Sequence, residues 1–155
     1  MRQLAAAPRS RAQLAEKLAS RDVPDELAER LLDRFEEVGL VDDAAYAEML
    51  VRTRHEERGL ARRALAHELR RKGVAPEVAE QALEQIDDED ELAAARDLAV
   101  RKARASRGLD RDRRRRRLAG MLARKGYSPG VAMRAVDEAL AAEGEEPDGE
   151  DLVLP

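Results

Sequence analysis

Apolar residues recur along most of this chain at spacings of three and four positions, the period of a helix with one buried face. Such stripes run through residues 14–18, 27–38, 46–51, 61–69, 78–86, 92–103, 118–122 and 131–140. β-branched residues are sparse, and no stretch alternates apolar and polar positions in the way that a strand does. The pattern therefore predicts an all-α fold.

A recurring turn separates the predicted helices. The sequence LRRKGVAP at residues 69–76 reappears as LARKGYSP at residues 122–129, 53 positions later, and a shorter copy with Asp in place of Gly covers residues 18–24. In each copy, basic residues favour the end of a helix, Gly takes the left-handed position after it, and Pro opens the next helix. A period near 50 residues is typical of tandem helical units.

This repeat divides the chain into tandem three-helix units, which we expect to form an elongated, curved array. We expect an incomplete first repeat at residues 1–41, complete repeats at residues 42–88 and 89–142, and an acidic tail at residues 143–155. Residues 1–7 are too few for a full first helix, so the first repeat is either naturally reduced or its start is assigned too late. The tail holds six acids and no base. We expect it to be disordered and to solubilise the protein, mimic DNA or shield basic helices.

The composition and the absence of known motifs exclude several classes of function. The chain has no Cys, which excludes disulfides, thiol catalysis and cysteine zinc sites. His55 and His67 lie twelve positions apart with no close third ligand, and no P-loop, nucleophile elbow, dinucleotide turn or H-E-x-x-H motif is present. We therefore predict no enzyme, no metal and no cofactor. No apolar run approaches the roughly 18–20 residues that span a bilayer, and the start lacks a secretory signal, so we predict a cytoplasmic protein. We also expect it to be a monomer.

Charge is unevenly distributed. The net charge is −4, but removal of the tail's six acids leaves the rest at +2. Residues 96–117 hold eleven Arg or Lys against three Asp, including five consecutive arginines that cover every direction around a helix. Basic helix faces of this kind favour a polyanion or an acidic protein surface. The candidate partner-binding residues are Arg62, Arg63, Arg70, Arg71, Lys72, Arg113, Arg114, Arg115, Arg116, Arg117, Arg124 and Lys125.

Part of the chain resembles a known family. GLVDDAAYA at residues 39–47, then Arg52, Arg54, Arg58 and Arg62, then ELRRKGV at residues 68–74 resemble the signature of the RecX family, bacterial regulators of the RecA recombinase. The resemblance covers roughly residues 4–142. It implies three tandem three-helix units that bind RecA filaments on DNA. It also implies that the protein restrains strand exchange, ATP hydrolysis and coprotease activity in DNA repair and the SOS response, by lodging in the filament groove or blocking its growth.

Two other functions remain open from the residues alone. The arginine-rich helices could bind nucleic acid without sequence preference, through phosphate contacts that weaken with salt. The chain has only three aromatic residues for stacking on bases and no recognisable base-reading helix. The third possibility is a structural adaptor for an unidentified partner, although a generic adaptor has no reason to repeat the Lys-Gly turn at this period.

Overall fold

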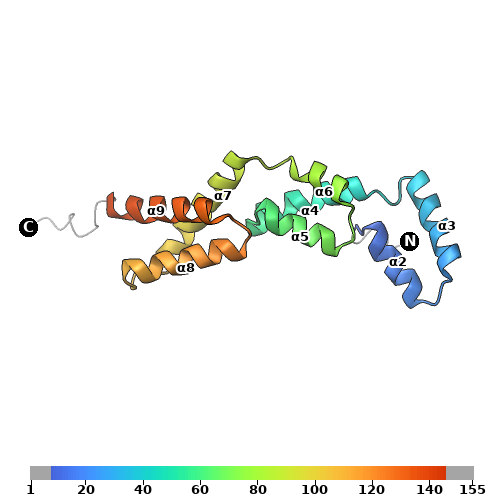
Figure 1. Cartoon of the computed structure of the whole chain (residues 1–155), viewed down its shortest axis with the longest axis horizontal. Helices are drawn as coiled ribbons and strands as arrows, with labels where there is room; N and C mark the ends of the chain where they lie inside the picture. Colours follow the sequence, from blue (N-terminus) through green and yellow to red (C-terminus); the bar gives the residue numbers. More distant parts are fainter. Residues whose placement is uncertain (1–7, 146–155) are drawn as a thin grey trace, which may run out of the picture. The chain divides into compact units, whose positions relative to one another are not determined.

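The computed structural model describes residues 8–145, and over those residues it contains eight helices and no strands (Figure 1). The helices are α2 (Arg11–Ser20), α3 (Asp25–Glu37), α4 (Asp43–Arg58), α5 (Arg62–Arg71), α6 (Pro76–Leu83), α7 (Asp88–Arg104), α8 (Arg111–Arg124) and α9 (Pro129–Glu145). The all-α prediction is confirmed for this part of the chain. None of these helices is long and apolar enough to cross a membrane.

The chain divides into two compact units. Unit 1 contains residues 1–58 and 63–85, and unit 2 contains residues 59–62 and 86–155. Helix α9 extends to Glu145, so the first acids of the predicted tail belong to this helix. The predicted first-repeat residues 1–7 and the remaining tail residues 146–155 lie outside the described residues.

Side-chain caps and left-handed residues mark the helix ends. The carboxylates of Asp87 and Asp110 accept backbone N–H bonds from the first turns of α7 and α8, so both act as N-caps. The residues after α5 and α8 are left-handed, with φ of 78° at Gly73 and 96° at Gly126. Asp22, which replaces Gly in the shortest copy of the turn, has φ of 61°. The prediction of a left-handed residue in each copy is therefore confirmed.

Unit 1 places the start of α2 against the turn that follows α5. The fully buried Ser10 donates its hydroxyl to the carbonyl oxygen of Lys72 at 2.5 Å and also accepts the backbone N–H of Gln13. The backbone N–H of Arg11 donates to Asp43 Oδ1 at 2.8 Å, which ties the same segment to the start of α4. The turn after α5 is thus a structural contact inside unit 1 as well as a helix end.

Gly73 is required at this turn for two reasons, which a pair of substitutions separates. Gly39 has the same φ of 78° but open space around it, whereas a Cβ on Gly73 would lie 2.3 Å from the Cβ of Ala12. We expect Gly39→Ala to cost about 1 kcal/mol for the left-handed backbone, and Gly73→Ala at least about 2 kcal/mol because α2 must also move. Urea unfolding of the two variants measures the difference, and equal losses would contradict the close approach of α2.

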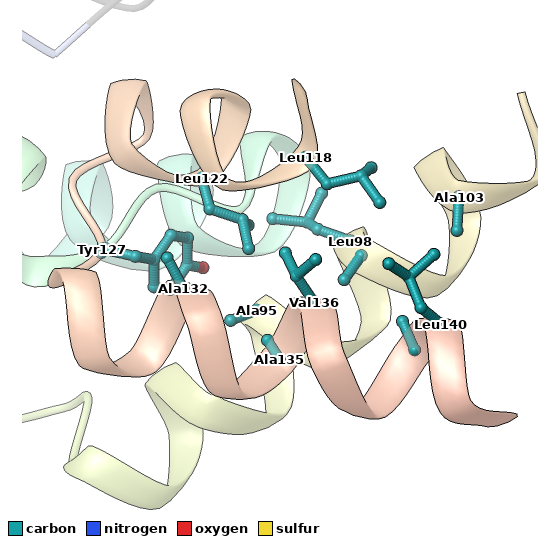
Figure 2. Packing of buried hydrophobic residues seen from close by; sticks show 13 residues of the cluster. Ala95, Leu98, Ala103, Leu118, Leu122, Tyr127, Ala132, Ala135, Val136 and Leu140 are labelled. Carbon is teal, nitrogen blue, oxygen red and sulfur yellow. The ribbon is translucent and has the colours of Figure 1, made fainter. Parts of the chain in front are cut away.

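Unit 2 is built on an alanine-rich core shared by α7, α8 and α9. Figure 2 shows Leu122 of α8 pointing toward α9, where Ala132 and Val136 lie. Seven of the thirteen buried residues in this cluster are alanines, so the helices pack closely with small side chains. Leu122 is fully buried in this cluster.

Residues 59–62 hydrogen-bond to the turn after α8, just as Ser10 hydrogen-bonds to the turn after α5 in unit 1. The backbone N–H of Ala61 donates to the carbonyl oxygen of Lys125 at 2.9 Å, and the hydroxyl of Tyr127 donates to the carbonyl oxygen of Gly59 at 2.7 Å. Burial raises the pKa of Tyr127 to about 12, since the ionised phenolate would be poorly solvated here. Lys125 stands 53 positions after Lys72, so the same carbonyl position of the repeat accepts a hydrogen bond in both units.

Candidate functional site

The candidate residues of unit 2 gather on α8, where the structure separates the five consecutive arginines into two groups. Arg114 and Arg115 point toward neighbouring helices and are partly buried, whereas Arg113, Arg116 and Arg117 are exposed. A helix turns about 100° per residue, so the three exposed arginines and Arg124 share one face of α8. We call Arg113, Arg116, Arg117 and Arg124 the α8 basic face.

Arg114 holds three helices of unit 2 together. Its guanidinium donates to the carbonyl oxygen of Ala103 at 2.9 Å, to the hydroxyl of Ser106 at 3.1 Å and to the carboxylate of Glu143 at 2.5 Å. Only 13% of its side chain is exposed. Each copy of the repeated turn begins with a leucine, and Arg114 lies eight residues before the leucine of the last copy, Leu122. Ser10 and Ala61 lie eight residues before the leucines of the other two copies. In α8 this position lies inside the helix and fastens it to the ends of α7 and α9.

Arg115 also has a structural partner. It forms a two-pronged ion pair with Asp137 of α9, with nitrogen–oxygen distances of 2.8 and 3.2 Å. The hydrogen bond from Arg115 holds the pKa of Asp137 below its usual range. Arg62 is similarly engaged, because its guanidinium bonds to Asp88 and Glu91 at the start of α7.

The other predicted residues remain available as contact residues. Within residues 8–145, no ion pair engages the side chains of Arg63, Arg70, Arg71, Lys72, Arg113, Arg116, Arg117 or Arg124. Lys125 differs from these residues because it takes part in a further interaction. Its backbone carbonyl oxygen also accepts a hydrogen bond from the backbone N–H of Ala61. In unit 1, a groove of about 530 Å³ lies between α5 and α6. Arg70 of α5 and Glu80 of α6 are the charged residues that line it. The exposed cations therefore lie on separate helices of the two units.

The α8 basic face borders a groove between the end of α7 and α8, with a volume of about 290 Å³. We call it the α7–α8 groove. Its lining residues are Lys102 in the last turn of α7, Ala105 and Ser106 directly after this helix, and Arg117, Leu118, Met121 and Arg124 of α8. The groove thus combines three cations with an apolar floor, which suits an anionic segment that carries apolar groups.

Lys102 was not among the residues predicted from the sequence. A short connection joins α7 to α8, so the last turn of α7 must lie beside the first turns of α8. Lys102 lies six residues before Gly108 and Arg117 lies nine residues after it, so a hairpin at this glycine brings both cations onto the neighbouring parts of α7 and α8. This hairpin geometry is the signal that could have identified Lys102.

The position of the arginines on α8 opposes the electrostatics of the helix. Arg111 and Arg113 occupy its first turn, where the exposed N–H groups make the helix end positive and disfavour cations. Asp110 and Asp112 offset this cost only in part. Residues that lower the stability of a helix, and that form no compensating ion pair within the described part of the chain, are typical of a binding surface. Among the described residues, no cluster of three or more His, Asp or Glu side chains could hold a metal ion.

The two groups of arginines predict opposite effects on stability. We expect Arg114→Gln to lower the free energy of unfolding by about 2 kcal/mol, because Glu143 and the carbonyl oxygen of Ala103 lose a partly buried charged partner. The neighbouring change Arg113→Gln should leave stability unchanged or raise it slightly, since it removes a cation from the first turn. Circular dichroism during urea unfolding measures both. Similar losses in the two variants would contradict the separation.

Comparison with known proteins identifies the chain's relatives. Models described as the first, second and third three-helix domains of RecX match residues 1–35, 42–83 and 88–136. Regulatory protein RecX of Streptomyces coelicolor is 59% identical over 146 residues, covering 94% of this chain and 78% of that protein. Regulatory protein RecX of Thermobifida fusca is 53% identical over 148 residues, covering 96% and 80%.

Solved structures agree with this comparison. A crystal structure of regulatory protein RecX superposes with a TM-score of 0.78 at 28% identity; the match covers 88% of this chain and 66% of that one, just under two thirds of its length. RecX from Lactobacillus salivarius has the same fold, with a TM-score of 0.80 at 22% identity and 90% and 91% coverage. The three tandem three-helix domains and the resemblance noted in the sequence are confirmed. The chain belongs to the RecX family of regulatory proteins.

Proposed function

We propose that this protein binds RecA filaments on DNA and restrains their strand exchange, ATP hydrolysis and coprotease activity. In this proposal it acts in the cytoplasm, during DNA repair and the SOS response, as a monomeric binding protein without catalysis of its own. The observation that carries the proposal is the 59% identity to a regulatory protein RecX, which extends over 94% of the chain and all three domains.

The arrangement of charges supports a large anionic or acidic partner. The α8 basic face presents four exposed arginines along one helix of unit 2, and α5 presents the exposed Arg63, Arg70 and Arg71 in unit 1. Their guanidinium groups have no ion-pair partner among residues 8–145, so a partner's carboxylates or phosphates could bind them without breaking an ion pair within that range.

The test is a titration of this protein into RecA during ATP hydrolysis that depends on single-stranded DNA, at about 0.15 M salt. Inhibition at far fewer molecules than RecA protomers would support a regulator that acts at filament ends or along the groove. Inhibition that requires an excess over DNA sites would favour competition for DNA. No inhibition would overturn the proposal.

The alternative function is non-specific nucleic-acid binding. The observation that favours it is the α8 basic face, whose arginines form no ion pair within residues 8–145. If four arginines contact phosphates, affinity for single-stranded DNA should fall with a slope of about −3 in a plot of log affinity against log salt. A RecA regulator should instead prefer RecA-coated DNA to naked DNA at physiological salt. Fluorescence anisotropy on both substrates distinguishes the two functions.

A further inference from the structure

The α7–α8 groove has an unexplained combination of features. Lys102, Arg117 and Arg124 surround a floor formed by Leu118 and Met121, and no ion pair engages the three cations within residues 8–145. An occupant must supply several negative charges and also apolar side chains. The last residues of the same chain have this composition.

We propose that residues 146–155 occupy the α7–α8 groove of their own molecule and shield it from other partners. Their sequence, EEPDGEDLVLP when read from Glu145, contains four acids and no base in residues 146–151, followed by Leu-Val-Leu at residues 152–154. The acids complement Lys102 and the α8 basic face, and the apolar residues complement the floor. The proposal goes beyond the regulatory function and does not require RecA.

The end of α9 is next to the groove. Glu143, two residues before the end of α9, bonds to Arg114 at 2.5 Å and lies 3.6 Å from Arg107 in the α7–α8 connection. Arg114 in turn bonds to Ser106, which lines the groove. One arginine side chain therefore separates the last turn of α9 from the groove.

Chain length permits the contact. Ten extended residues reach about 33 Å, whereas the ten-residue rise along α8 from Arg114 to Arg124 is about 15 Å. A segment attached this close has a high effective concentration, of the millimolar order for a short linker. Weak ion pairs and a small apolar contact can thus fill the groove when they belong to the same chain.

A fluorescence experiment on the full chain tests the proposal. The sequence has no Cys and no Trp, so one of each can be introduced as a unique pair. Ala105→Cys, at the rim of the groove, carries a bimane label, and Leu154→Trp provides a contact quencher. Ala93→Cys, exposed near the other end of α7, is the matched control. We expect the tryptophan to remove most of the bimane emission at position 105 and to leave the emission at position 93 unchanged.

Removal of the cations completes the test. Arg117→Gln together with Arg124→Gln should restore the emission at position 105, and circular dichroism checks that helicity is retained. Equal emission at positions 93 and 105, or quenching that survives the loss of both arginines, would overturn the proposal. If quenching is absent and a labelled oligo-dT instead crosslinks to position 105, the groove belongs to nucleic acid and the proposal is again wrong.

Discussion

Reversing two charges on the α8 basic face is expected to weaken inhibition of RecA at least about tenfold, a loss of about 1.4 kcal/mol. The change is Arg116→Glu together with Arg117→Glu. Both side chains are exposed and have no ion-pair partner among the described residues, so the substitution changes the surface and leaves the core intact. In the proposed complex, each new carboxylate would repel the acidic or phosphate groups that the arginine attracted.

The matched control carries the same change in net charge elsewhere. Arg30→Glu with Arg34→Glu alters two exposed arginines of α3 that were not predicted to bind the partner. The measurement is the concentration that halves RecA-dependent ATP hydrolysis, with helicity checked by circular dichroism. If both double variants inhibit equally well, α8 is not the contact surface; if both fail equally, net charge rather than position is responsible.

Truncating a fully buried leucine of unit 2 should produce the largest loss of stability. Leu122 is fully buried in the cluster of α7, α8 and α9, and Figure 2 shows it between Tyr127 and Leu118. Leu122→Ala should cost about 3–4 kcal/mol, because the lost apolar contacts leave a cavity that alanine neighbours cannot fill.

Val100→Ala provides the comparison within the same unit. Val100 is an apolar residue of α7 with 42% of its surface exposed, so its truncation should cost less than about 0.5 kcal/mol. Urea unfolding followed by circular dichroism measures both variants. A loss in Leu122→Ala no larger than that in Val100→Ala would show that α8 does not pack on α7 and α9 in solution.

Local chemistry accounts for the features that were predictable from the sequence. The apolar periodicity places the helices, and the left-handed Gly73 and Gly126 follow from a turn that few other residues tolerate. Asp110 caps α8 because an acceptor is needed immediately before a helix. Each of these depends on residues within a few positions of one another.

Contacts between distant residues were not predictable in the same way. Five consecutive arginines are equivalent in the sequence, which indicated only that the run covers every direction around a helix, so that one or two must point inward or toward a partner. Arg114 is selected by Glu143, which lies 29 positions later, and Arg115 by Asp137, 22 positions later. The burial of Ser10 depends on Lys72, 62 positions away. Such pairings are set by how helices pack, which periodicity alone does not specify.

The alanine-rich core of unit 2 also determines how stability should vary with temperature. Most of the heat-capacity change of unfolding comes from apolar surface that water reaches, and alanine contributes little such surface. With seven alanines among thirteen core residues, unit 2 should fall below the typical value of about 12–15 cal/mol/K per residue. Its free energy of unfolding should consequently change only gradually with temperature, and its urea m-value should be small for its length.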